Sequence, residues 1–100
     1  MDAEVKRGTG VKVRMYSTRF CPYCMRARSL LSEKGIDWEE LAVDSDPELR
    51  AQMMAESGRH TVPQIWINET HVGGFDELWL LEQRGELDPL LQSAPSGFIK

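Results

Sequence analysis

Residues 17–35, "STRFCPYCMRARSLLSEKG", contain the two cysteines of the chain, Cys21 and Cys24. The cysteines are separated by two residues and stand where a strand pattern gives way to a helical one. Pro22 suits the first turn of a helix, because its missing N–H would have no partner there in any case. Gly35 suits the position just past a helix end. The spacing leaves three interpretations open: a structural disulfide, half of a metal site, or a pair of reactive thiols.

The chemistry of the cysteine pair favours reactive thiols. A disulfide across two residues closes a very small loop and removes little unfolded-state entropy. Zinc prefers four ligands, and the two histidines, His60 in a predicted loop and His71 in a predicted strand, match none of the usual ligand spacings. The Cys21 sulfur would face the unpaired backbone N–H groups of a helix N-terminus, which favour negative charge. We therefore predict that Cys21 attacks a disulfide sulfur, and that Cys24, less exposed and less acidic, can resolve the mixed disulfide.

The rest of the chain predicts the order β-α-β-α-β-β-α. Strands are predicted at residues 11–17, 36–43, 64–67 and 71–74, and helices at 21–35, 46–58 and 75–85, with a last helical turn at 86–91. A helix between the first two strands favours their parallel pairing through a right-handed crossover. The last two strands predict an antiparallel hairpin. The expected fold class is α/β, with a mixed four-stranded sheet flanked by helices. Leu49, Met53 and Met54 are predicted to form the apolar side of the second helix.

Length and composition indicate one soluble globular domain. The chain has 100 residues, of which 41% are hydrophobic, and a net charge of −4. It shows no apolar run of the ~20 residues that cross a bilayer. Its start resembles no secretory signal, so a cytoplasmic protein is expected. We expect a monomer that binds neither nucleic acid nor membranes. Residues 1–10 are predicted to be a flexible leader and residues 92–100 a C-terminal tail.

Charge is unevenly distributed along the chain. Residues 1–35 carry eight basic and three acidic side chains, whereas residues 36–100 carry four and thirteen. Arg19, Arg26 and Arg28 flank the cysteines. These arginines form either a solvated helix face or a cationic environment for a thiolate or an anionic substrate.

Three short motifs together resemble bacterial dithiol glutaredoxins. They are "CPYC" at residues 21–24, "TVPQIWI" at 61–67 and "GGFDEL" at 73–78, and the resemblance covers residues 11–91. It implies a thioredoxin fold and a glutathione-dependent thiol–disulfide oxidoreductase. The implied substrates are protein–glutathione mixed disulfides and other disulfides, with ribonucleotide reductase among the partners. Glutathione is the implied co-substrate, and no metal is expected.

The same resemblance implies how glutathione binds. Pro63 would be cis and lie against the cysteines, and the backbone of Val62 would pair with the extended tripeptide. The N–H groups of Phe75 and Asp76 would hold the γ-glutamyl carboxylate, and the Asp76 side chain its ammonium group. Gly74 permits a close backbone approach. The implied glutathione-binding residues are Arg19, Tyr23, Arg59, Thr61, Val62, Pro63, Gly74, Phe75 and Asp76.

One position departs from the family pattern. Thr18 stands three residues before Cys21, where glutaredoxins commonly have a lysine. Arg19 and Arg59 are therefore the two candidates for binding the glycine carboxylate of glutathione. Tyr23 is expected to form part of the groove wall.

Other functions stay open at this stage. One is a thioredoxin-like reductase recharged by a flavoenzyme, although the paired glycines followed by Asp76 favour a zwitterionic ligand. Another is a carrier in which two chains share a [2Fe–2S] cluster through Cys21 and two glutathiones; Pro22 makes that loop stiffer. The last is a protein of the same fold that only binds partners, which the presence of both cysteines disfavours.

Overall fold

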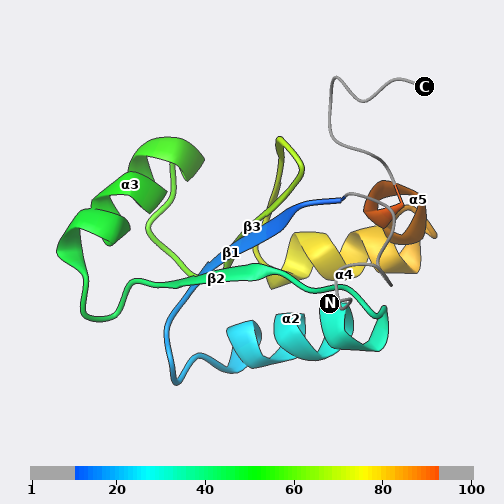
Figure 1. Ribbon diagram of the computed structural model, residues 1–100, viewed down its shortest axis with the longest axis horizontal. Helices are drawn as coiled ribbons and strands as arrows, with labels where there is room; N and C mark the ends of the chain where they lie inside the picture. The colour runs from blue at the N-terminus through cyan, green and yellow to red at the C-terminus, as the bar shows by residue number, and fades with distance from the viewer. Residues whose placement is uncertain (1–10, 93–100) are drawn as a thin grey trace, which may run out of the picture.

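The computed structural model describes residues 11–92. The predicted leader and the predicted tail beyond Gln92 lie outside the described residues. The elements are β1 (Val13–Ser17), α2 (Pro22–Glu33), β2 (Glu39–Ala42), α3 (Pro47–Ser57), β3 (Gln64–Ile67), β4 (Thr70–Gly73), α4 (Phe75–Gln83) and α5 (Leu87–Leu91) (Figure 1). This confirms the predicted order, including the last helical turn.

The four strands form one mixed sheet in the order β2-β1-β3-β4. β1 runs parallel to β2, while β1 with β3 and β3 with β4 are antiparallel. The predicted strand at 36–43 is shorter in the structure because β1 offers partners only from Arg14, opposite Glu39, to Ser17, opposite Ala42. The mixed four-stranded sheet is thus confirmed, with strand ends displaced by a few residues.

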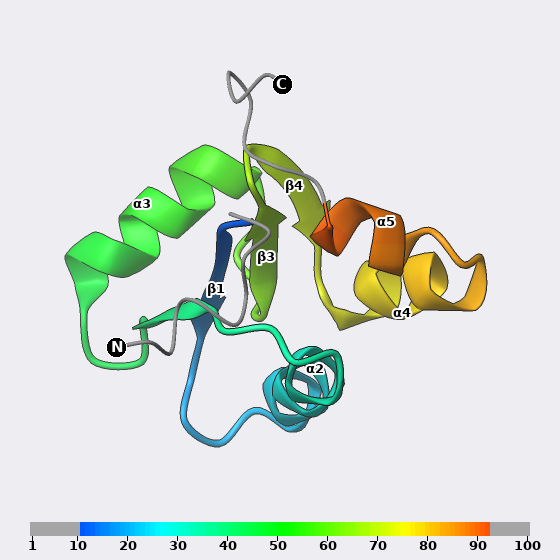
Figure 2. The same ribbon diagram turned by 45° about the vertical axis from the view of Figure 1, so that its right-hand side comes forward.

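Helices cover both faces of the sheet (Figures 1 and 2). On the α2/α4 face, inward side chains of β1 and β3 meet α2, α4 and α5; those strand residues are Val13, Met15, Ile65 and Ile67. On the α3 face, the alternate residues Tyr16 and Trp66 pack with Val43 and Met53. Successive strand residues point to opposite faces, so the same two strands supply both clusters.

Helix α3 begins and ends at the predicted residues. The Asp46 carboxylate accepts a hydrogen bond from the Leu49 N–H at 3.1 Å, and Pro47 is the first helical residue. Gly58 adopts the left-handed conformation that ends the helix, with φ 72°. The placement of Met54 in the core was wrong. Met53 is fully buried, but Met54 is 45% exposed, because adjacent residues of a helix point about 100° apart.

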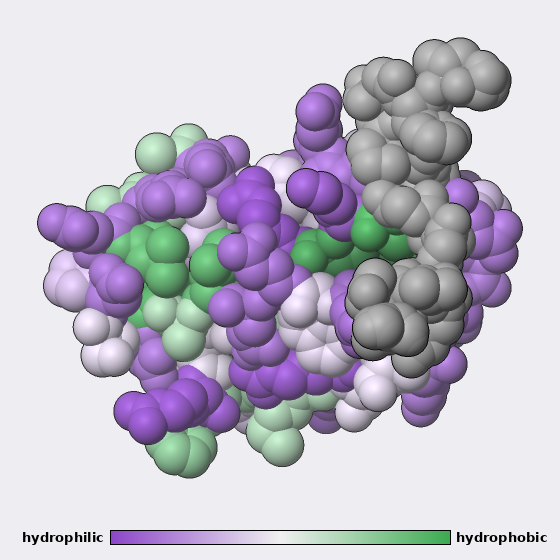
Figure 3. All heavy atoms as spheres, viewed as in Figure 1, coloured by the Kyte–Doolittle hydropathy of each residue, from purple (hydrophilic) through white to green (hydrophobic). Residues whose placement is uncertain are grey.

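The outer surface is mainly hydrophilic in the view of Figure 3, with apolar patches between polar side chains. Within residues 11–92, each helix is too short or too polar to cross a membrane.

Candidate functional site

Cys21 lies immediately before helix α2 and is partly exposed. Its Sγ accepts a hydrogen bond from the backbone N–H of Cys24 at 3.2 Å, so the sulfur caps the helix. As a thiol, it also faces the carbonyl oxygen of Val62, 3.7 Å away, to which its S–H donates. The predicted placement of this sulfur at a helix N-terminus is confirmed.

Cys24 is buried one turn further along α2, as predicted. Burial and then the hydrogen bond with Cys21 raise the pKa of the Cys24 thiol to about 12. A backbone hydrogen bond with Thr18 and the charge of Arg28 act in the opposite direction but are outweighed. The two thiols therefore differ: one is accessible and capped by an N–H, and the other stays protonated at neutral pH.

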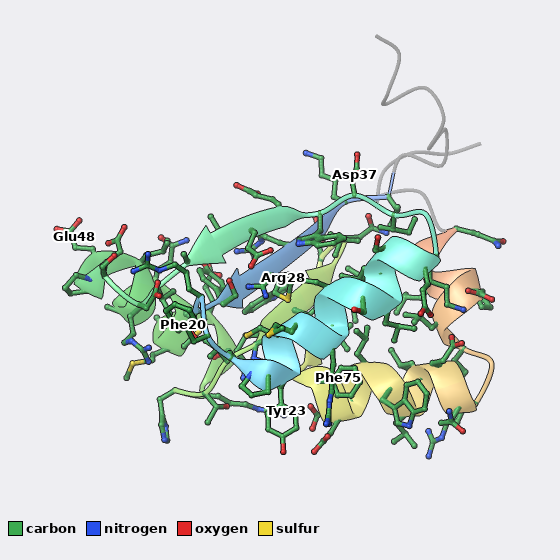
Figure 4. The ribbon with its side chains drawn as sticks, turned by 90° about the horizontal axis from the view of Figure 1, so that it is seen from below. Phe20, Tyr23, Arg28, Asp37, Glu48 and Phe75 are labelled. Atoms are coloured by element: carbon green, nitrogen blue, oxygen red, sulfur yellow. The ribbon has the colours of Figure 1, made fainter. Side chains whose placement is uncertain are left out.

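Arg28 connects helix α2 to the edge strand β2 (Figure 4). Its Nε donates to Glu40 Oε2 at 2.8 Å, and its Nη2 donates to the carbonyl of Thr18 at 3.3 Å. The Ser17 hydroxyl donates to the same carboxylate at 2.6 Å. Burial opposes ionisation of Glu40, but these hydrogen bonds outweigh it and lower the pKa of its carboxyl. Arg28 is thus a partly buried side chain paired with Glu40, and its charge acts to lower the pKa of the Cys24 thiol.

A pocket of about 330 Å³ opens beside the loop that faces Cys21. Its lining residues are Tyr23, Arg59, Thr61, Val62, Pro63, Gly74, Phe75, Asp76 and Glu77. The peptide bond between Val62 and Pro63 is cis, as expected. Figure 4 shows Tyr23 at the start of α2 and Phe75 at the start of α4, on the same side of the molecule. Three segments far apart in the sequence, the starts of α2 and α4 and the loop before β3, thus meet at one pocket.

The start of α4 forms one wall of this pocket. Gly73 has φ 116°, a conformation open to glycine but strained for other residues. A Cβ atom on Gly74 would lie 3.3 Å from the Pro63 carbonyl oxygen, so a glycine there lets the two segments approach closely. Asp76 stands in the first turn of α4, next to the free N–H groups of the helix end.

Glu77 also lines the pocket, although the sequence analysis did not select it. Its Oε1 accepts a hydrogen bond from the Gly74 N–H at 2.7 Å and lies 3.5 Å from Arg59 Nη1. The hydrogen bond from Gly74 is the main cause that lowers the pKa of the Glu77 carboxyl, despite partial burial. A glutamate three residues after the residue that precedes a helix is a capping signal, and this signal could have identified it.

The two candidate arginines lie in different places. Arg19 is paired with Asp44. The backbone N–H and the Nε of Arg19 donate hydrogen bonds to Asp44 Oδ2, at 3.1 Å and 3.4 Å. Arg19 does not line the pocket, whereas Arg59 does. Every other predicted binding residue lies on the pocket wall.

Comparisons with known proteins agree with this arrangement. The family model described as Glutaredoxin matches residues 13–72. A glutaredoxin of Pseudomonas aeruginosa is 56% identical over 79 residues, which cover 79% of this chain and 94% of the relative. The solution structure of glutaredoxin from Brucella melitensis has a TM-score of 0.75 and 46% identity, covering 93% of this chain and 98% of the other.

The fold extends to more distant structures. The crystal structure of a buckwheat glutaredoxin–glutathione complex has a TM-score of 0.75 at 23% identity, covering 89% of this chain and 86% of that one, a likeness of fold. The structural neighbours are glutaredoxins with a thioredoxin fold, and this chain shares that fold. Family and fold together support thiol–disulfide oxidoreductase activity. The chain belongs to the glutaredoxin family.

Proposed function

We propose that this protein is a glutathione-dependent oxidoreductase that reduces protein–glutathione mixed disulfides. The observation that carries this proposal is the pocket beside Cys21. It combines the N-terminus of α4, the carboxylate of Asp76 and the loop that contains Val62, whose carbonyl lies 3.7 Å from Cys21 Sγ. A tripeptide with a zwitterionic end and a central cysteine fits this combination of groups.

Each part of glutathione finds a complementary group in the pocket. The N–H groups of Phe75 and Asp76 at the start of α4 suit the γ-glutamyl carboxylate, and the Asp76 carboxylate suits the neighbouring ammonium group. The backbone of Val62 suits the extended cysteinyl residue. When Cys21 loses its proton, the Val62 carbonyl loses its S–H donor and becomes available to an N–H of the ligand. Arg59 suits the glycine carboxylate.

The reaction proceeds by two exchanges at sulfur. The Cys21 thiolate attacks the glutathionyl sulfur of the mixed disulfide, a Cys21–glutathione disulfide forms, and the substrate protein leaves as a thiolate that takes up a proton. A second glutathione thiolate then attacks the glutathionyl sulfur on Cys21. Oxidised glutathione leaves, and the Cys21 thiolate is restored. Overall, one free glutathione thiol is consumed, and the disulfide bond passes from the protein–glutathione pair to oxidised glutathione.

Cys24 offers a slower alternative for the second exchange. Its attack on the Cys21 sulfur would release glutathione and form a Cys21–Cys24 disulfide. Because the pKa of Cys24 is raised to about 12, only a very small fraction of this thiol is ionised at neutral pH. We therefore assign the release of glutathione mainly to a second glutathione, and the use of Cys24 to disulfides that lack glutathione.

Single-cysteine variants test these roles. Cys21→Ser should abolish the reduction of a glutathionylated protein, whereas Cys24→Ser should retain most of it, measured with glutathione, glutathione reductase and NADPH. At pH 7, iodoacetamide should alkylate Cys24→Ser much faster than Cys21→Ser, since Cys24 is buried and protonated. Equal loss of activity in both variants would contradict the assignment.

The two arginines provide a matched pair of variants. Arg59→Ala should raise the KM for glutathione on the order of fivefold, the size expected for losing one exposed charge-assisted hydrogen bond. Arg19→Ala removes the same charge from outside the pocket and should leave that KM within about twofold. A larger effect at Arg19 would show that the ligand extends toward Asp44 instead.

The alternatives predict other readouts. A thioredoxin-like reductase would be recharged by NADPH and thioredoxin reductase without glutathione, and a [2Fe–2S] carrier would show visible absorbance when purified without oxygen. We expect glutathione dependence and a colourless monomer. We also propose a reducing compartment, the cytoplasm, because the reaction consumes reduced glutathione. Ribonucleotide reductase remains a proposed protein partner that the same assay can test as a substrate.

A further inference from the structure

We propose that Gln64 and His71 are positioning residues of the pocket: together they fix Thr61, and with it the loop that faces Cys21. This inference rests on the proposed function, because it concerns the affinity of the pocket for glutathione. Neither residue lines the pocket itself.

Gln64 holds Thr61 from inside the protein. It is fully buried at the start of β3, directly after Pro63. Its Nε2 donates to the Thr61 carbonyl oxygen at 3.1 Å and to the Thr61 hydroxyl at 3.3 Å. Thr61 is exposed and lines the pocket, so apolar packing does little to fix its position. One buried amide therefore fixes two polar atoms of the pocket wall.

His71 in turn fixes the orientation of Gln64. Its Nε2 lies 2.8 Å from Gln64 Oε1. Because the amide nitrogen of Gln64 points to Thr61, the amide oxygen is left facing the imidazole, and His71 must donate the proton. His71 therefore carries a hydrogen on Nε2. Burial and then the charge of Arg59 lower the pKa of His71, with Glu77 acting in the opposite direction, which favours the neutral ring.

The imidazole ring is itself held by stacking. His71 lies opposite Trp66 in the β3–β4 pairing, and the two ring centroids are 4.5 Å apart with planes inclined by 29°. The guanidinium carbon of Arg14 lies 4.6 Å from the centroid of the same indole. A continuous set of contacts thus runs from the α3 face of the sheet, through His71 and Gln64, to Thr61 on the pocket wall.

Two variants of His71 separate the hydrogen bond from the stacking. His71→Phe keeps an aromatic ring against Trp66 but leaves Gln64 Oε1 without its donor. His71→Gln restores an N–H at a similar reach but loses the ring. The measurements are kcat and KM for glutathione, together with amide hydrogen exchange of Thr61 and Val62 followed by NMR.

If the two residues position the pocket, His71→Phe raises the KM for glutathione on the order of fivefold, with kcat within about twofold. His71→Gln should stay within about twofold of the wild type in both. Exchange at Thr61 and Val62 should be faster in His71→Phe than in His71→Gln. A role in stability alone would lower the melting temperature without this ordering.

Equal KM values and equal exchange rates in the two variants, or the opposite ordering, would overturn the inference. If the wild type showed no saturable dependence on glutathione, the proposed function would fail. The exchange rates of Thr61 and Val62 would then still decide whether His71 and Gln64 fix the loop.

Discussion

The two faces of the sheet are formed by alternate residues of the same strands but with different chemistry. The α2/α4 face receives apolar side chains from β1 and β3, packed with those of α2, α4 and α5. The α3 face receives Tyr16 and Trp66, which pack with Val43 and Met53 but also contact the polar side chain of Arg14.

On the α3 face, the Tyr16 hydroxyl is the centre of a group of hydrogen bonds. It donates to Glu56 Oε1 at 3.0 Å and accepts from Arg14 Nη1 at 3.1 Å and from Gln52 Nε2 at 2.9 Å. Glu56 and Gln52 come from α3, so these bonds join the helix to the sheet. Figure 2 shows α3 alone on its side of the sheet.

The two faces therefore contribute differently: one stabilises the packing of helices on the sheet, and the other fixes the position of the loop before β3. Apolar burial is strong but has no preferred direction, so it can hold α2 and α4 against the sheet without fixing a loop. Hydrogen bonds are directional. On the α3 face, Arg14 lies over the Trp66 ring, Trp66 stacks on His71, and His71 donates a hydrogen bond to Gln64. The pocket depends on both faces. The starts of α2 and α4 are held by packing on the α2/α4 face, and the loop before β3 is held by contacts on the α3 face.

The largest effect is expected from a cavity on the α2/α4 face. Leu78 in α4 is fully buried, whereas Leu80, two residues later, is 48% exposed. Leu78→Ala should lower the free energy of unfolding by about 2–5 kcal/mol, and the melting temperature by roughly 10 °C or more.

Leu80→Ala is the matched control on the same helix and should change stability by no more than about 0.5 kcal/mol. Urea unfolding of both variants measures the difference. Similar losses at the two positions would show that the apolar side of α4 is not the one described.

A smaller effect is expected on the α3 face. Tyr16→Phe keeps the buried ring but removes the hydroxyl that bonds Arg14, Gln52 and Glu56. The loss should be about 1 kcal/mol, because Arg14 and Glu56 still pair at 3.0 Å. Tyr23→Phe, at a half-exposed ring, should leave urea unfolding unchanged. A loss at Tyr16 as large as that at Leu78 would remove the contrast between the two faces.

The sequence predicted the α2/α4 face better than the α3 face. Local sequence patterns indicate which residues are buried, but they do not indicate which distant side chains form hydrogen bonds with one another. Val13 and Met15 alternate along the predicted strand at 11–17, as the inward residues of a strand do, and both lie on this face. Met54 was misplaced because a hydrophobic residue next to a buried one gives no sign of which side it takes. The start of α2 after Cys21 and the bounds of α3 were predicted correctly, since each helix end depends only on residues within about one turn.

The sequence could not predict hydrogen bonds between residues that are far apart in the chain. Arg19 stands nearest to Cys21 in the sequence, yet Asp44, 25 residues away, holds it outside the pocket. Similarly, no local pattern indicates that Gln64 bonds both Thr61 and His71. The motif "GGFDEL" did predict the pocket wall at α4, because there the geometry is set by glycines and a helix start.

The smallest expected effect is on the stability of the protein at acidic pH. Burial opposes ionisation of Glu56, but hydrogen bonds from Arg14 and Tyr16 outweigh it and hold the pKa of its carboxyl below the ordinary 4.5. A lowered pKa means that the unfolded chain binds more protons, so this contribution is present above the ordinary pKa and is lost as the pH falls. Since Glu56 is partly exposed, the amount should be only a few tenths of a kcal/mol.

Glu56→Gln should therefore unfold in urea with a flatter pH dependence between about pH 5 and pH 3 than the wild type. The destabilisation by Leu78→Ala should be the same throughout this interval, since burial of a leucine involves no proton. An equally steep profile for Glu56→Gln and the wild type would mean that the α3 face owes no specific stability to the hydrogen bonds of Glu56.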